Sequence, residues 1–506
     1  MNPPAFERLS TQDSTFLVFE NAHAHMHVGG TAILEAGPLR RSQGGTDIAR
    51  IRAYIASRLH WLPRYRQRLA FVPIENHPVW VDDDHFNLNY HVRHACLPHP
   101  GDDEQLKQLI GRIMSQQLDR GKPLWEAWII EGLADDRVAL VTKAHHCMVD
   151  GIAGVDLLSV LLSPTPEATI ETPPPWTPRP LPSRLDLLRD ALTRRVSGPV
   201  ELARSLTRVL DEPDEVRDQL MQRARATLQM IGAGLRRPAA TPINQPIGPH
   251  RRFDWLRLDL DDVKRVKNQL GGTVNDVVLA TVSGGVRRFL MHRGVSVKGL
   301  DYRVVLPVSM RAPQEHGTSG NRVSAWITSL PVHERDPRRR LDAVRQTTIQ
   351  LKQAKFELGA DTLTEVGELA GSGMMTLGVR LAARLHPYNL IVTNVPGPQL
   401  PLYLLGAQML EGYPQVPLFE YQGLGVALFS YVGKLCWGFN ADWDLLPDLP
   451  DLVGAVAAAF RELYGAATRS PATVQQRASV RRTGVVRRGS SMAARRDRDP
   501  SVDRRG

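Results

Sequence analysis

The proline-rich segment Pro164–Pro182 (PTPEATIETPPPWTPRPLP) constrains the fold of this 506-residue chain more than any other feature. Proline lacks a backbone N–H and has a fixed φ, so this segment is excluded from helix interiors and central strands. We interpret it as an exposed linker. The chain is also longer than one hydrophobic core usually serves. We therefore expect a first lobe at 1–163, a proline-rich and helical linker at 164–239, a second lobe at 240–467 and a tail at 468–506.

The tail differs from the rest of the chain in charge. Residues 468–506 hold 11 arginines and 3 aspartates, so they carry +8 of the total net charge of +10. The tail has almost no large apolar side chains, which predicts disorder. The remaining body is close to neutral, and this argues against nucleic acid as a partner of the folded part.

Strand-like and helix-like patterns alternate in the body, which predicts a mixed α/β fold. Between the linker and Pro238, leucines recur at helical spacing, and we expect this face to pack against the body rather than lie on a membrane. Its members are Leu185, Leu188, Leu192 and Val196. The expected strands are Arg137–Lys143, Tyr302–Val308, Leu390–Asn394 and Gly425–Tyr431, and a helix is expected at Gly151–Leu162.

The chain reads as a cytoplasmic protein. Its three cysteines, Cys96, Cys147 and Cys436, are too few and too scattered for a disulfide framework or a four-thiolate metal site. The N-terminus lacks the basic and apolar regions of a secretory signal. We find no apolar run of about 18 residues, so no segment is expected to span a bilayer.

The sequence His145-His146-Cys147-Met148-Val149-Asp150-Gly151 carries the chemistry. It lies where a predicted strand ends and a predicted helix begins. Successive strand residues point to opposite sides, so at most one of the two histidines faces a reactant. Imidazole has a pKa near 6.5 and suits general base catalysis at neutral pH. Asp150 alone would read as a helix cap.

With this motif the chain resembles the HHxxxDG acyltransferase superfamily, and within it the bacterial wax ester synthase/diacylglycerol acyltransferase family. The resemblance extends to about Gly465 and rests on several blocks in order. These are LSTQDSTFLVFENAHAHMHVGG from Leu9, Pro123-Leu124-Trp125, PIGP from Pro246 followed by Arg251-Arg252, GTVNDVV from Gly272, LPVSMR from Leu306, GNRVSAW from Gly320 and NVPGP from Asn394.

The resemblance implies two lobes of chloramphenicol acetyltransferase type, joined by a linker, with a tunnel between them. It implies an acyl-CoA-dependent O-acyltransferase that makes triacylglycerol from diacylglycerol, and wax esters from long-chain alcohols. Acyl-CoA is then a substrate, and we expect neither a metal nor another cofactor. A peripheral position at the inner membrane face or on lipid droplets follows from the lipid substrates. The sequence does not choose between diacylglycerol and a fatty alcohol as acceptor.

The resemblance also implies roles for individual residues. His146 is the general base, and the resemblance places His145, Asp150 and Asn275 with it in the catalytic set. Asn275 is either an amide donor to the oxyanion or a turn residue that caps a helix, and in the second case Asp276 beside it is structural. Arg311 is either a surface turn residue or the salt-bridge partner of Asp150. Packing or substrate positioning is expected of Pro123, Leu124, Trp125, Gly151 and Asp276.

Three alternatives compete with this interpretation. Cys147 could form an acyl-enzyme, although neighbouring residues on an extended segment diverge. A metalloenzyme could be built from His145, His146, Asp150 and the alternating His23, His25 and His27. The third alternative is a non-enzymatic lipid-droplet coat or nucleic-acid-binding module that uses the basic tail.

Overall fold

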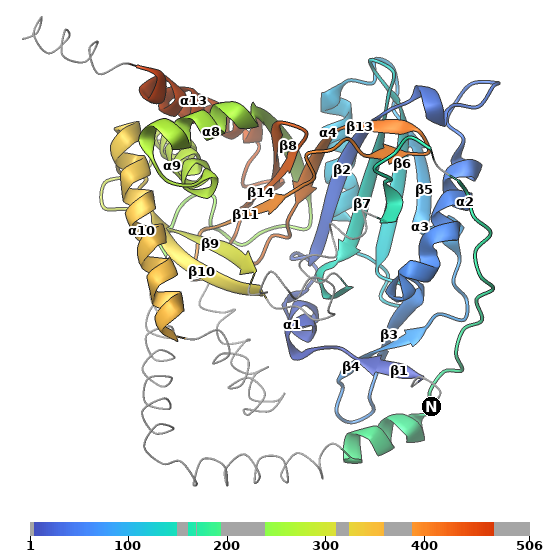
Figure 1. Cartoon of the computed structure of the whole chain (residues 1–506). Coiled ribbons are helices and arrows are strands. Elements are labelled where there is room, and N and C mark those ends of the chain that lie inside the picture. Colours follow the sequence, from blue (N-terminus) through green and yellow to red (C-terminus); the bar gives the residue numbers. More distant parts are fainter. Residues whose placement is uncertain are drawn as a thin grey trace, which may run out of the picture.

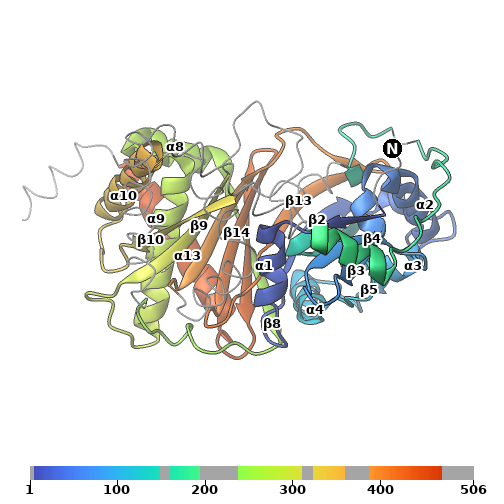
Figure 2. The same ribbon diagram turned by 90° about the horizontal axis from the view of Figure 1, so that it is seen from below.

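The computed structural model describes residues 5–148, 160–167, 169–193, 238–309, 323–358 and 387–469. Within these ranges it is a mixed α/β protein with two six-stranded sheets and one small sheet, as the sequence predicted. The two large sheets form two halves of the molecule, and α1 (Thr11–Phe19) lies between them (Figures 1 and 2). None of the helices in the described ranges combines the length and apolarity that a bilayer crossing requires.

The N-terminal sheet has the strand order β12-β13-β2-β7-β6-β5. Its central strand, β7 (Arg137–His145), is buried along almost its whole length, as expected for the apolar run RVALVTK. The other strands are β2 (His27–Glu35), β5 (Val92–Cys96), β6 (Trp125–Leu133), β12 (Tyr403–Leu404) and β13 (Ala407–Gln415). Its helices are α2 (Ile48–Arg58), α3 (Leu88–His91) and α4 (Asp103–Ser115).

The C-terminal sheet has the order β10-β9-β11-β14-β15-β8. Its strands are β8 (Arg251–Asp259), β9 (Tyr302–Ser309), β10 (Val323–Leu330), β11 (Leu390–Pro396), β14 (Leu424–Tyr431) and β15 (Lys434–Asp442). Among the described residues, four helices cover its outer face (Figure 1): α8 (Leu260–Leu270), α9 (Val274–His292), α10 (Pro337–Leu358) and α13 (Leu449–Thr468). The predicted strands at 302–308, 390–394 and 425–431 are confirmed as β9, β11 and β14.

Two strands from the C-terminal part of the chain belong to the N-terminal sheet. Strands β12 and β13 lie within 240–467, yet β13 pairs with β2 of the N-terminal sheet, from Met409 opposite Leu34 to Gln415 opposite Gly29. Figure 1 shows β13 reaching across to that sheet. The second lobe therefore completes the sheet of the first.

A second junction joins β8 to α4. The backbone N–H of Arg251 donates to Ser115 Oγ at 2.8 Å, and its buried guanidinium donates to the backbone carbonyl of His23. Nearby, Ile110, Phe253 and Tyr413 belong to one hydrophobic cluster. This shared core joins α4 to the strands of the C-terminal half.

The small sheet β1-β4-β3 carries part of the linker. Its strands are β1 (Phe6–Arg8), β3 (Gln67–Phe71) and β4 (Pro78–Asp82). A helix at 184–193 packs on it, as expected of this stretch, but not through the expected face, of which Val196 lies outside the described residues. Leu185 and Leu192 are 55% and 60% exposed, whereas Leu187 and Ala191 are buried against this sheet. The proline-rich segment is mostly exposed, and Arg179 anchors its end to Asp82 at 2.7 Å.

Candidate active site

The end of β7 places the two histidines of the motif. The backbone N–H of His145 donates to the carbonyl of Leu124 at 2.9 Å, and the N–H of His146 donates to that of Met26 at 2.7 Å. A short 3-10 helix, η4 (His146–Met148), follows at once. The segments that precede β6 and β2 therefore fix the turn from both sides.

The two imidazoles lie in different surroundings. His145 is fully buried, whereas His146 is partly exposed. The ring of His146 stacks on Phe16 of α1, with ring centroids 3.8 Å apart and planes 14° from parallel. Of the pair, His146 is therefore the one that a reactant can approach.

Burial lowers the pKa of His146 to about 4, and its own backbone carbonyl opposes that shift. The imidazole is therefore neutral at physiological pH. The neutral ring is the form that accepts a proton from a hydroxyl.

His145 is held by a buried acid that the sequence analysis did not identify. The N–H of Cys147 donates to His145 Nδ1 at 3.1 Å, so the proton of the neutral ring is on Nε2. His145 Nε2 lies 3.4 Å from Glu20 Oε2, and Glu20 directly follows α1. The Glu20 side chain is 1% exposed and also accepts from Arg120 Nε at 2.9 Å.

Burial raises the pKa of Glu20, but the contacts with His145 and Arg120 outweigh it and hold the pKa at about 2. Glu20 is therefore a buried carboxylate at neutral pH, paired on two sides. In the sequence, Glu20 stands out only as an acidic residue at the end of the apolar run STFLVFE.

Cys147 lies in the hydrophobic core of the N-terminal half. Burial raises the pKa of its thiol well above the usual value. A buried, protonated thiol is a poor nucleophile. The geometry therefore gives no support to a cysteine acyl-enzyme.

The other histidines near the motif do not form a metal site within the described ranges. His27 lies opposite His145 in the β2–β7 ladder, but their ring centroids are 6.3 Å apart. His27 Nε2 accepts from the backbone N–H of Leu118 at 3.4 Å, and burial lowers the pKa of His27 well below its usual value. No three His, Cys, Asp or Glu residues of the described chain are arranged to hold an ion.

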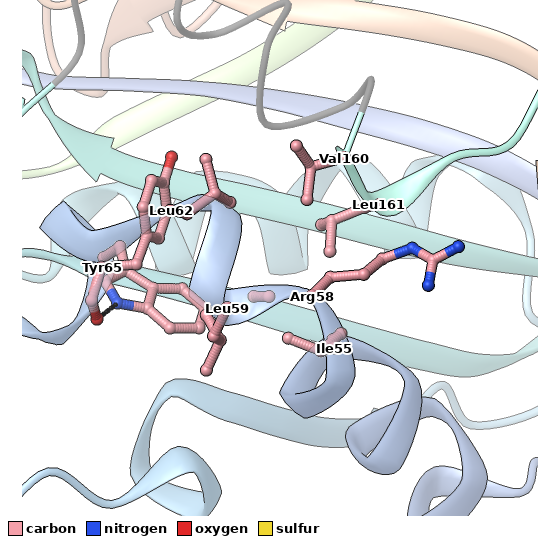
Figure 3. A pocket seen from close by; sticks show the side chains of 9 residues that line it. Ile55, Arg58, Leu59, Leu62, Tyr65, Val160 and Leu161 are labelled. Atoms are coloured by element: carbon pink, nitrogen blue, oxygen red, sulfur yellow. Dashed lines mark hydrogen bonds between the residues drawn. The ribbon is translucent and has the colours of Figure 1, made fainter. Parts of the chain in front are cut away.

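The Pro123-Leu124-Trp125 segment holds the motif through its backbone, and its indole ties the segment to Tyr65. Leu124 accepts from His145, as described above, and the Trp125 N–H donates to the carbonyl of Pro123 at 2.9 Å. The indole Nε1 donates to the backbone carbonyl of Tyr65 at 2.8 Å. Trp125 also lines a small apolar pocket in the N-terminal half (Figure 3), together with Ile55, Arg58, Leu59, Leu62, Tyr65, Ala127, Val160 and Leu161.

Asn275 and Asp276 lie at the start of α9 in the other half. Asp276 completes a capping box with Thr273, because Asp276 Oδ2 accepts from the Thr273 N–H at 2.7 Å and the Asp276 N–H donates to Thr273 Oγ1. Asp276 Oδ1 accepts from Thr348 Oγ1 at 2.7 Å. Asn275 Oδ1 accepts from Asn394 Nδ2 at 2.6 Å. Both asparagines line a cavity of about 90 Å³, and His146 is not among its lining residues.

The remaining predicted site residues, Asp150, Gly151 and Arg311, lie outside the described residues. The predicted ion pair between Asp150 and Arg311 therefore stays a prediction. The helix expected at Gly151–Leu162 is described only from residue 160 onward.

Two family models match the chain. The wax ester synthase/diacylglycerol acyltransferase catalytic domain matches residues 9–278, and the C-terminal domain of the same family matches residues 319–464. A probable diacylglycerol O-acyltransferase of Mycobacterium tuberculosis, tgs1, is 33% identical over 470 residues, which cover 92% of this chain and 97% of that protein. A putative diacylglycerol O-acyltransferase of the same organism, Rv1760, is 34% identical and covers 92% of both chains.

Solved structures give the same result for the fold. The wax ester synthase/diacylglycerol acyltransferase of Marinobacter aquaeolei VT8 superimposes with a TM-score of 0.66 at 25% identity, and the match covers 92% of this chain and all of that one. The starter condensation domain of rhizomide synthetase, solved with C8-CoA, has a TM-score of 0.55 at 13% identity and covers 92% and 95% of the two chains. The second likeness concerns the fold alone.

Proposed function

Because the chain belongs to the wax ester synthase/diacylglycerol acyltransferase family and is an acyltransferase, we propose that it acylates the free hydroxyl of diacylglycerol with acyl-CoA. His146 is the general base in this proposal. This proposal rests on a contrast within the motif. The ring of His146 is neutral, stacks on Phe16 and is partly exposed, whereas His145 and Cys147 are buried.

The reaction needs one proton to move twice. His146 accepts the hydroxyl proton as the alcohol oxygen attacks the thioester carbonyl. The tetrahedral intermediate then collapses, the C–S bond breaks, and the imidazolium returns the proton to the departing thiolate. An ester and free CoA are the products. No covalent enzyme intermediate is required, which agrees with the buried, protonated state of Cys147.

The other residues around the motif position the base. Glu20 holds His145, and His145 in turn accepts the N–H of Cys147 in the turn that bears His146. Phe16 and Glu20 belong to the same short segment, α1 and the residue after it. One segment therefore supports both histidines.

The acceptor is tested directly with purified protein and palmitoyl-CoA. Dioleoylglycerol and hexadecanol are offered separately while release of free CoA is followed. We expect turnover with dioleoylglycerol and weaker turnover with hexadecanol, because the mycobacterial relatives are named diacylglycerol acyltransferases. Turnover with hexadecanol alone would make the chain a wax ester synthase. Failure with both acceptors would contradict a lipid acceptor.

We further propose that the protein works at a lipid surface in the cytoplasm, since its acceptor is not water-soluble. The basic tail suits such a surface, because polybasic segments bind anionic lipids with about 1 kcal/mol per residue near the surface. Nucleic acid is not proposed as a partner, because the charge is concentrated in residues 468–506.

A further inference from the structure

The cavity at the start of α9 does not have His146 among its lining residues, and the reaction proposed above assigns it no role. It has a volume of about 90 Å³ and lies in the C-terminal half, where α9, α10, β9, β10 and β11 meet. Its walls include Leu306, Trp326 and Val392. Its polar lining includes Asn275, Lys352 and Asn394.

Two amide groups in this lining have hydrogen-bonding capacity left. Asn394 donates its Nδ2 to Asn275, but Asn394 Oδ1 is buried and accepts no hydrogen bond from any described residue. A buried polar atom without a partner costs about 1–3 kcal/mol, so it calls for an explanation. Asn275 is exposed and uses Oδ1 to accept from Asn394, so its Nδ2 is open to solvent or to a ligand.

The neighbouring polar groups do not offer the same capacity. Thr273 and Asp276 are joined in the capping box, and Thr348 donates to Asp276. The donor and acceptor left for a ligand are therefore Asn275 Nδ2 and Asn394 Oδ1. They sit on side chains that contact each other.

A donor beside an acceptor is complementary to a secondary amide, whose carbonyl accepts while its N–H donates. The volume and apolar walls of the cavity suit one such amide with its flanking carbons. Lys352 adds an exposed cation to the same lining. The pantetheine arm of CoA has two secondary amides in an alkyl chain, and its far end carries phosphates.

We propose that this cavity binds a pantetheine amide of the acyl-CoA donor, with Lys352 facing the phosphates. This inference rests on the proposed function for its substrate. A diacylglycerol ester carries no N–H to satisfy Asn394 Oδ1. An alcohol hydroxyl can both donate and accept, but it brings no anion for Lys352. A pantetheine amide pairs with Asn275 and Asn394, and a phosphate pairs with Lys352, so CoA offers a partner to all three polar side chains.

The test measures binding of CoA and of pantetheine to the full chain by calorimetry, and the KM for palmitoyl-CoA by turnover. Asn394→Leu keeps the side-chain volume and removes the amide, so it should weaken both ligands about tenfold. Lys352→Gln is a surface change that should weaken CoA about fivefold and leave pantetheine unchanged, because pantetheine has no phosphate. Asn268→Ala and Lys264→Gln on the exposed face of α8 are the matched controls and should change neither.

Unchanged CoA affinity in both Asn394→Leu and Lys352→Gln would overturn the proposal. So would a fall in kcat at constant KM, which would instead assign Asn275 and Asn394 to the reacting atoms. A rise only in the KM for the alcohol would make the cavity an acceptor site. If the wild-type chain binds CoA but transfers no acyl group, the proposed function fails while the cavity assignment stands.

Discussion

The Glu20 carboxylate lies 3.4 Å from His145 Nε2, and both side chains are buried. Together with the bond from the Cys147 N–H to His145 Nδ1, this contact fixes the tautomer of His145 and the turn that carries His146. These two contacts explain why His145 is fully buried although the next residue, His146, is partly exposed.

Glu20→Gln should lower both stability and activity. The change keeps the shape but leaves His145 and Arg120 without their charged partner, and we expect a loss of about 2–3 kcal/mol in unfolding free energy at neutral pH. Activity should fall about tenfold, because the turn that bears His146 loosens. Glu104→Gln, on the exposed N-terminal turn of α4, is the control.

The pH dependence of this variant has a defined sign. The pKa of Glu20 is lowered from 4.5 to about 2, so its stabilisation is present above pH 4.5 and is lost as the pH falls toward 2. The stability difference between wild type and Glu20→Gln should therefore shrink across that window in acid titrations followed by denaturant unfolding. A difference that stays constant from pH 5 to pH 2 would show that the Glu20 charge does not contribute.

Cys147→Ala should remain active. Loss of the buried sulfur leaves a small cavity worth about 1 kcal/mol, but it removes no nucleophile from the proposed reaction. Cys436→Ala, in the core of the other half, is matched in burial. Rapid-quench experiments should show no covalent acyl-enzyme in the wild type. A burst of acyl-enzyme that disappears in Cys147→Ala would establish the cysteine mechanism instead.

Asp150 and Arg311 should be coupled. We predict that they form a salt bridge that joins the motif to the second half, so Asp150→Asn and Arg311→Ala should each lower thermal stability and activity. A double-mutant cycle on unfolding free energy should give a coupling of about 1–3 kcal/mol. A coupling near zero would return Asp150 to the role of a helix cap.

Deletion of residues 470–506 should leave turnover in solution unchanged and weaken binding to anionic vesicles. The deleted segment holds most of the excess positive charge of the chain. Co-sedimentation with vesicles at low and high salt measures the effect, since added salt screens this attraction. Equal sedimentation of both forms at low salt would mark the tail as a passive extension.

Local patterns predicted the strands well and the long-range pairings poorly. The runs that became β7, β9, β11 and β14 are apolar and rich in β-branched residues, so their identity was readable. The pairing of β13 with β2 could not be predicted from local patterns, because nothing in residues 407–415 themselves indicates a partner strand nearly 400 positions away in the chain.

The buried face of the helix at 184–193 was predicted wrongly for a related reason. Its leucines offer two faces at helical spacing, and only the contact with the small sheet selects Leu187 and Ala191. The bond from Arg8 Nε to Asp190 at 2.7 Å also fixes the rotation of the helix. Both partners of this packing are distant in sequence.

In the candidate site, too, local patterns identified some residues, whereas others are revealed only by the fold. The spacing of the motif identified His145 and His146, whereas Glu20 and Phe16 are brought to them by the fold from more than a hundred residues away. The partner of Asn275 was equally hidden, since Asn394 is 119 positions along the chain.

The rate of CoA release by His146→Ala is the sharpest test of His146 as the general base. We expect a fall of about a hundredfold to ten-thousandfold with an unchanged melting temperature, because a partly exposed base supplies rate rather than packing. His145→Ala should lower the melting temperature and slow turnover less. An active His146→Ala beside an inactive, folded His145→Ala would show that His146 is not the general base.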